Sequence, residues 1–265
     1  MRKTEKNDLK KLLTKGYVVI KNATSIKECD KIKRLYFNIS KKYKKICKIK
    51  NPLEDSIYNL HNKNDIFLKY LDHKKIINIV KMALSKGSYG ENDFIILRQS
   101  AIRNPQKGYA QQLHNDTRIS NMRNPLIIQA IWMIDDFTKN NGATRVVPNS
   151  HNSLFFPKNK KKYKNEKIIE AKKGSVLLLN ASMWHGSAEK KNSSDRLGMI
   201  FSYSRWFLKP SFDHTINTPK KVFNKLTSFQ KELLGFKFIV PKDEFSRSSS
   251  RLKNNVKPKE NYVLP

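Results

Sequence analysis

The pattern of hydrophobic and polar positions divides the chain into a helix-rich first part and a strand-rich second part. Up to about residue 90, apolar residues recur at helical spacing; Leu9, Leu12 and Leu13, for example, share one helical face. Gly16 then stops this helix, and the apolar run after it is typical of a strand. Three helices and one strand are predicted in this part. The first helix covers 6–15, the second runs from a cap at Thr24 or Ser25 to Ile39, and the third covers 74–85. The strand covers 17–20.

From residue 94 the apolar residues gather in short runs that turn signals separate, such as Asn140-Asn141-Gly142 and Lys173-Gly174. Several short strands with turns between them indicate a sandwich or a barrel. We therefore predict a mainly β fold with packing helices (α+β), for which a double-stranded β-helix, the cupin-like jelly roll, is one solution. The predicted strands cover 94–97, 111–118, 126–134, 144–147, 175–180 and 197–204.

The organisation predicts a single domain over 1–240, with a helix-rich part at 1–90 and the jelly-roll core at about 94–206. The lysine-rich stretch 157–168 is expected to be a surface loop, and one further helix is expected near 219–234. Residues 241–265 are rich in Ser, Lys, Asn and Pro, which is typical of a loose tail.

Charge is the most unusual feature of the composition, since 54 Lys and Arg face 22 Asp and Glu, for a formal net charge of +32. Such an excess is typical of partners that are polyanions, such as nucleic acid. A bias toward AT-rich codons explains it equally simply, because Lys is spread along the whole chain and Asn and Ile are also abundant. We favour the bias, since no zinc-finger, RNP-like or homeodomain-like pattern is present.

The remaining composition indicates a cytoplasmic protein without a membrane span. No apolar run reaches the length of a bilayer, and no apolar segment follows the charged N-terminus as it would in a secretion signal. The two cysteines, Cys29 and Cys47, are expected to be free thiols that pack in helices.

A His-x-Asp pair, His114 and Asp116, provides the first candidate chemistry. Residues i and i+2 of a strand point to the same face, so both side chains could reach one metal ion. The pair is weak evidence by itself, because it also occurs by chance at protein surfaces.

A second histidine would complete the two-histidine, one-carboxylate set that leaves three positions open on a non-haem iron(II) ion. His151 and His185 are the candidates. His185 is favoured because Arg196 follows it by eleven positions, and a guanidinium near the metal can bind a carboxylate through two parallel hydrogen bonds. His151 is expected to be a turn histidine bonded to the backbone.

The order of these motifs resembles the phytanoyl-CoA dioxygenase family of iron(II)/2-oxoglutarate oxygenases, over roughly residues 94–206. His114-x-Asp116, then His185-Gly186-Ser187, then Arg196 carry the resemblance. The middle of the chain adds a tryptophan-bearing strand at 129–134, an Asp-Asp-x-Thr turn at 135–138, and the run 146–151, which has Asn149 where the family usually has Gly.

The resemblance implies a jelly-roll fold and an enzyme that uses iron(II), 2-oxoglutarate and dioxygen. His114, Asp116 and His185 would be catalytic residues that bind iron. Arg196 would bind the distal carboxylate of 2-oxoglutarate, with Ser187 as its hydroxyl partner. Trp132 would line the cofactor pocket, and Gln99 would lie near the cofactor or substrate, unless it is an outward-facing strand residue.

The reaction expected from this resemblance is hydroxylation of a small-molecule or carrier-linked substrate, with release of succinate and CO2. Related halogenases have Ala or Gly in place of the carboxylate, so Asp116 favours hydroxylation. The net charge adds the hypothesis that the substrate is anionic. The alternatives are an oxygenase acting on nucleic acid and a non-catalytic jelly-roll binding protein. The substrate itself and the oligomeric state are left open.

Three other histidines, His61, His73 and His214, have no partner motif and are expected at the surface. Trp184 and Trp206 are expected in the core.

Overall fold

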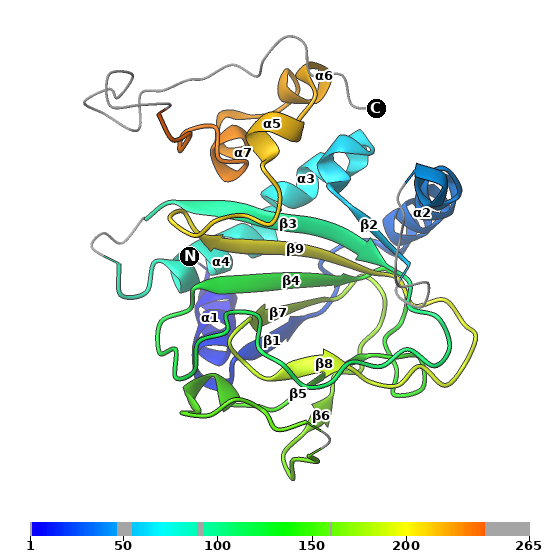
Figure 1. Cartoon of the computed structure of the whole chain (residues 1–265), viewed down its shortest axis with the longest axis vertical. Helices are drawn as coiled ribbons and strands as arrows, with labels where there is room; N and C mark the ends of the chain where they lie inside the picture. Colours follow the sequence, from blue (N-terminus) through cyan, green and yellow to red (C-terminus); the bar gives the residue numbers. More distant parts are fainter. Residues whose placement is uncertain (1, 47–54, 89–92, 160, 242–265) are drawn as a thin grey trace.

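Two antiparallel sheets and a layer of helices form the molecule (Figure 1). The computed structural model describes residues 2–46, 55–88, 93–159, 161–241. The larger sheet has the order β1-β7-β4-β9-β3-β2 and the smaller one the order β6-β5-β8. The strands of the larger sheet are β1 (Tyr17–Ile20), β2 (Ser56–Tyr58), β3 (Ile95–Arg103), β4 (Ile127–Met133), β7 (Val176–Asn180) and β9 (Gly198–Arg205); those of the smaller sheet are β5 (Thr144–Val146), β6 (Lys167–Ile168) and β8 (His185–Ser187).

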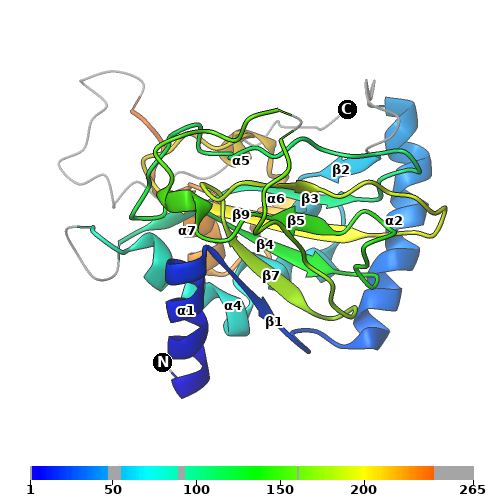
Figure 2. The same ribbon diagram turned by 90° about the horizontal axis from the view of Figure 1, so that it is seen from below.

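Helices cover one face of the larger sheet. The α-helices are α1 (Lys3–Lys15), α2 (Ile26–Ile46), α3 (Leu68–Leu71), α4 (Lys74–Leu84), α5 (His214–Asn217), α6 (Lys220–Phe223) and α7 (Ser228–Leu233), and the 3-10 turns are η1 (Leu60–Asn62), η2 (Asp65–Phe67) and η3 (Ser150–Asn152). Helix α4 packs across β4 and β9, α1 packs on α4 and beside β1, and α7 packs on β3. The view from below shows α2 at one side of the sheet and α1 near the other (Figure 2).

Successive side chains of the central strands point to opposite faces of the larger sheet, and both faces are buried. On β7, Val176 and Leu178 belong to the main core under the helices, whereas Leu177 and Leu179 belong to a second core between the two sheets. The main core runs from Leu12 to Phe236. Strand β7 is therefore apolar at successive positions, in agreement with the short apolar run in its sequence.

The turn from α1 into β1 depends on Gly16. Its φ is +85°, and its N–H donates to the carbonyl of Leu12 at 3.0 Å. A Cβ atom built on Gly16 would lie 2.7 Å from Met183 Sδ, so both the backbone and the packing require glycine.

The structure confirms the predicted jelly-roll class and most of the predicted elements. Three expectations were wrong. Residues 111–118 form no strand, and their ladder contact is a single bridge between His114 and His185. The helix expected near 219–234 is two short helices, α6 and α7. His61 and His214 are not at the surface: their rings are buried and meet edge to face, with centroids 5.1 Å apart.

The other expectations about single residues can be placed briefly. Cys29 is a buried free thiol, whereas Cys47 and the tail from 242 onward lie outside the described residues. Trp184 is buried, and Trp206 is half-buried. Among the helices of the described residues, none has the length and apolar character needed to cross a bilayer.

Candidate metal centre

A cavity of about 980 Å³ opens against the face of the larger sheet that the helices leave uncovered. Ile127, Gln129 and Ile131 of β4 line it, because odd-numbered residues of this strand point away from the helices. The triad predicted from the sequence, His114, Asp116 and His185, lines the same cavity. The volume is typical of sites for small molecules.

The backbone brings the triad together. His114 and His185 exchange two backbone hydrogen bonds of 2.9 Å, which fixes the segment around His114 against β8. The amide of Asp116 donates to the carbonyl of Ala181 at 2.8 Å. As a result, one ligand atom from each of the three side chains lies within 4.8 Å of the others, close enough to hold one metal ion.

The rings of both histidines are oriented for binding through Nε2. Nδ1 of His114 lies 2.9 Å from the carbonyl oxygen of Gln112, and Nδ1 of His185 lies 2.8 Å from that of Met183. A carbonyl can only accept, so Nδ1 donates in both rings and the lone pair stays on Nε2. The two Nε2 atoms face opposite oxygens of Asp116, at 3.4 Å for His114 and 3.6 Å for His185.

Electrostatics keep Asp116 ionised. Burial would raise the pKa of this carboxyl, but the imidazoles of His114 and His185 outweigh burial and hold the pKa well below its usual range. The hydrogen bond to Asp116 in turn raises the pKa of His114 above its ordinary value. The side-chain amide of Gln129 donates to Oδ2 of Asp116, which orients the carboxylate.

Arg196 lies in the same cavity, buried, where the loop before β9 approaches β8. Its Nη2 donates to Ser187 Oγ at 3.1 Å, and its guanidinium lies 4.7 Å from the centroid of Phe137. Burial lowers the pKa of Arg196 to about 10, so it remains a cation at neutral pH. Its Nε has no hydrogen-bond partner among the described residues, which leaves a donor for a bound anion.

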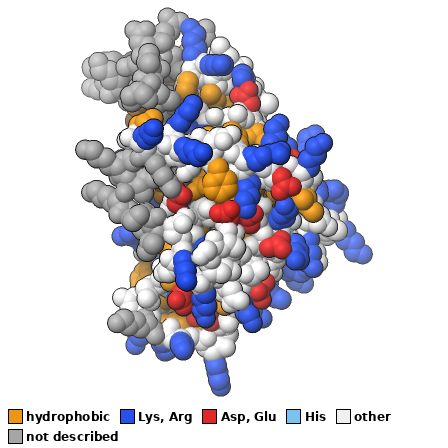
Figure 3. All heavy atoms as spheres, turned by 90° about the vertical axis from the view of Figure 1, so that its right-hand side faces the viewer, with side chains coloured by type: hydrophobic (Ala, Val, Ile, Leu, Met, Phe, Trp, Pro, Cys, Tyr) orange, Lys and Arg blue, Asp and Glu red, His pale blue; other side chains and the backbone are white. Residues whose placement is uncertain are grey.

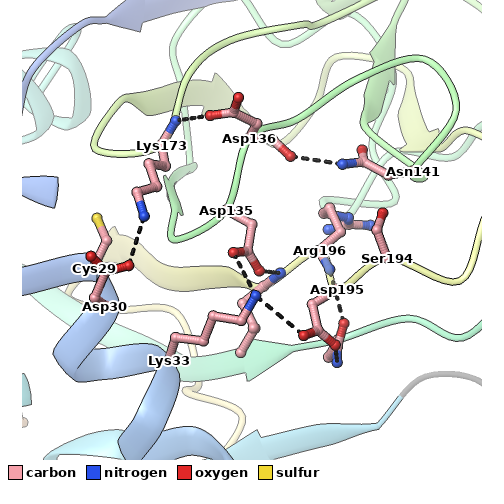
Figure 4. A network of polar contacts seen from close by, with 12 residues as sticks. Cys29, Asp30, Lys33, Asp135, Asp136, Asn141, Lys173, Ser194, Asp195 and Arg196 are labelled. Carbon is pink, nitrogen blue, oxygen red and sulfur yellow. Dashed lines mark hydrogen bonds and ion pairs between the residues drawn. The ribbon is translucent and has the colours of Figure 1, made fainter.

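A polar network fixes the backbone on both sides of Arg196 (Figure 4). The amide of Arg196 donates to Asn104 Oδ1 and that of Leu197 donates to Asp135 Oδ2, both at 3.0 Å. Lys33 of α2 binds the two neighbouring carboxylates, Asp135 at 2.9 Å and Asp195 at 3.2 Å. A helix residue 163 positions earlier in the sequence therefore helps to hold the loop that carries Arg196.

Of the other predicted site residues, one lines the cavity and one does not. Gln99 of β3 lines the cavity. Trp132 does not, which corrects our expectation: it is fully buried in the main core on the helix side of β4, where it packs edge-on against Tyr70 and His73. His151 is a turn histidine bonded to the backbone, as expected, since its Nε2 lies 3.2 Å from the Leu13 carbonyl oxygen.

The sequence analysis missed Gln129, Arg98, Arg103 and Arg118, all of which line the cavity. Gln129 had a signal, because it is the single polar residue in the apolar strand Ile127–Met133. The three arginines had no such signal in the sequence, because nothing distinguishes them there from the many other cations of the chain.

A jelly-roll cavity with two histidines, one carboxylate and a nearby arginine defines the class of non-haem metal-dependent dioxygenases. The model of the phytanoyl-CoA dioxygenase family matches residues 12–198. The chain therefore belongs to this family, and so to the iron(II)/2-oxoglutarate oxygenases that its sequence resembles.

The chain is also similar to curated relatives in sequence and to a solved structure in fold. Dioxygenase trt7 of Aspergillus terreus is 24% identical over 204 residues, 74% of this chain and 69% of the relative. The uncharacterised protein Rv1501 of Mycobacterium tuberculosis is 24% identical over 183 residues, 68% of this chain and 67% of the relative. The fold is similar to that of HygX from Streptomyces hygroscopicus, solved with nickel and 2-oxoglutarate bound, with a TM-score of 0.65 at 17% identity over 77% of this chain and 88% of that one.

Proposed function

We propose that this dioxygenase hydroxylates a small-molecule substrate, with iron(II) bound by His114, Asp116 and His185 and 2-oxoglutarate bound through Arg196. The observation that carries the proposal is the presence of the three convergent ligand atoms and the buried guanidinium in one cavity. The donors fit the ion: two neutral imidazole nitrogens and one carboxylate are the set that iron(II) takes in such sites.

Each side chain would have a distinct task. Gln129 donates to Oδ2 of Asp116 and would orient this carboxylate toward the metal. Arg196 would bind the distal carboxylate of 2-oxoglutarate, for which its Nε is available, and Ser187 would hold the guanidinium in place. Phe137 lies against the guanidinium and screens it from water.

Bound together, iron(II) and 2-oxoglutarate would activate dioxygen, with one oxygen atom ending in succinate and the other in the hydroxylated substrate. The carboxylate of Asp116 fills the position that a halide would need, which supports hydroxylation over halogenation. Gln99 lines the same cavity, which supports a contact between Gln99 and the substrate.

The face of the molecule drawn in Figure 3 gives no support for a nucleic-acid substrate. Lys and Arg side chains are scattered over the face in Figure 3, with Asp and Glu among them, and they form no continuous basic stripe there.

The proposal is tested by a screen of small molecules with iron(II), 2-oxoglutarate and ¹⁸O-labelled dioxygen. We expect one label in succinate and one in the product. Succinate formation that no compound stimulates, together with unlabelled products, would argue against hydroxylation.

A further inference from the structure

Three arginines line the cavity in addition to Arg196. They are Arg98 and Arg103 of β3 and Arg118 of the loop that follows Asp116. Among the described residues, Asp116 is the one carboxylate in the same lining. The wall of the cavity is therefore strongly cationic.

The proposed cofactors do not neutralise these cations. The two charges of iron(II) and the one of Arg196 are matched by Asp116 and by the two carboxylates of 2-oxoglutarate. Nothing in this set remains to balance the charge of Arg98. An anionic group on the substrate would balance this charge.

A β-bulge turns Arg98 into the cavity. The pairing of β3 with β9 shifts register between Leu97 and Gln99, so that Leu97 pairs with Tyr203 and Gln99 with Ser202. Leu97 packs in the main core, whereas Arg98 and the next residue, Gln99, both line the cavity. A bulge changes the direction of a side chain in this way, and bulges are frequent beside active sites.

The side chain of Arg98 is half-buried and has no ion pair with the described residues. Its carbonyl accepts from the amide of Ser211 at 2.9 Å, which brings Asp213 near in the chain. Asp213 caps α5 through Oδ1, which accepts from the amides of Thr215 at 3.0 Å and Ile216 at 3.2 Å. The guanidinium of Arg98 has no side-chain hydrogen bond or ion pair with the described residues, and Arg98 lines the cavity, so it is available to a ligand.

Arg98 lies at the opposite end of the cavity from the proposed 2-oxoglutarate position. Arg103 pairs with Gly198, two residues after Arg196. Arg98 precedes Arg103 by five positions, which is roughly 15 Å along a strand. A five-carbon diacid bound to the metal and to Arg196 cannot also reach Arg98.

Asp116 lies across the strands from Arg98, at about the same level of the sheet. Ser202 of β9 pairs with Gln99 on one side and with Gln129 on the other, so the three residues form one row across the sheet. Gln129 contacts Asp116 at one end of this row, and Gln99 lies next to Arg98 at the other. A molecule that spans the row would have one end at the metal and the other at Arg98.

We propose that Arg98, with Gln99 beside it and Tyr58 on the neighbouring strand, binds an oxyanion group, a phosphate or a carboxylate, of the substrate. The proposal rests on the function proposed above and adds the substrate class. A guanidinium binds either group through two parallel hydrogen bonds. The anionic end of the substrate is held there, and the carbon to be oxidised faces the metal.

The test measures binding of three probes to the full chain saturated with iron(II) and 2-oxoglutarate without oxygen. Phenyl phosphate and benzoate carry the two candidate oxyanions, and benzamide is the neutral counterpart of benzoate. Wild type, Arg98→Gln and Arg98→Lys are compared with the control Arg123→Gln, which removes an exposed arginine outside the cavity lining.

We expect the wild type to bind phenyl phosphate or benzoate at least tenfold more tightly than benzamide, and the better anion identifies the group. Arg98→Gln should lose this preference, Arg98→Lys should keep part of it, and Arg123→Gln should keep all of it. Equal binding of the anion by wild type and Arg98→Gln would overturn the proposal, as would equal binding of the three probes by wild type. If the wild type binds neither iron(II) nor 2-oxoglutarate, the proposed function is overturned instead.

Discussion

Arg196 donates a hydrogen bond from Nη2 to Ser187 Oγ at 3.1 Å, and this contact connects the loop before β9 with β8, the strand that begins with the metal ligand His185. The hydroxyl of Ser187 itself donates to the carbonyl of Gly142 at 2.9 Å. Its lone pairs are therefore directed at the guanidinium. The contact fixes the distance between the proposed metal and the proposed carboxylate-binding group.

Removing either partner should affect 2-oxoglutarate more than iron. We expect Arg196→Ala to raise the KM for 2-oxoglutarate about 100-fold, since two charge-assisted hydrogen bonds are worth about 1.5 kcal/mol each. Ser187→Ala should raise it only about fivefold, because the hydroxyl orients the guanidinium while Arg196 keeps its own bonds to the carboxylate. Both variants should keep the iron(II) affinity of wild type. An unchanged KM in Arg196→Ala would exclude the role of this residue.

Gln129 should act on the metal through Asp116. We expect Gln129→Leu to weaken iron(II) binding about tenfold, the usual effect of losing a residue that orients a ligand. Gln106→Leu is the matched control, because Gln106 is exposed and binds the carbonyl of Asn104 outside the cavity lining. Equal iron affinities for the two variants, measured by anaerobic titration, would show that the hydrogen bond to Asp116 does not matter.

Lys33 should position Arg196 without touching either cofactor. Lys33→Met removes the cation between Asp135 and Asp195, and we expect the KM for 2-oxoglutarate to rise roughly three- to tenfold with a smaller change in kcat. Lys33→Arg should restore most of the affinity. Lys31→Met, on an exposed position of the same helix, is the control. If kcat falls and KM stays constant, the network does not act through Arg196.

Because His61 and His214 are buried, we expect the free energy of unfolding to fall at acid pH. Burial lowers the pKa of His214 to about 4 and that of His61 well below its ordinary value. The unfolded state takes up the protons first, near pH 6.5, so stability present above that pH is lost as the pH falls toward 4. His214 alone accounts for about 2 kcal/mol between pH 7 and pH 5.

Urea denaturation of the metal-free protein measures this effect. In His214→Phe the difference in unfolding free energy between pH 7 and pH 5 should shrink by about that amount. The same difference in wild type and variant would mean that His214 does not remain neutral in the fold.

The sequence predicted the parts of the fold that apolar runs define. The runs at 126–134 and 175–180 became β4 and β7, because strands buried on both faces are apolar throughout. Strand β8 has the polar sequence His-Gly-Ser and forms because it pairs with β5. The local sequence does not predict this pairing. The segment 111–118 failed as a strand because its side chains bond to their own backbone, as Asn115 does with the amide of Arg118.

The residues of the site also fall into those that the sequence predicted and those that it did not. The spacing of His114, Asp116, His185 and Arg196 is a property of the sequence, and the structure places the four residues in one cavity. Trp132 was misplaced because alternation along β4 sends it to the helix side, and the register of a strand cannot be read from one motif. Lys33 and Gln129 act through contacts between distant segments, which only the folded chain shows.

The proposed metal centre is tested most directly by an anaerobic titration of the metal-free protein with iron(II) and then with 2-oxoglutarate, followed by visible absorption. We expect one iron(II) per chain and a charge-transfer band that develops only after 2-oxoglutarate is added, as its 2-oxo acid group binds the metal. Asp116→Ala should bind iron(II) at least tenfold more weakly and form no succinate. Wild-type protein that binds no iron(II), or an Asp116→Ala variant with full succinate formation, would rule out this metal centre.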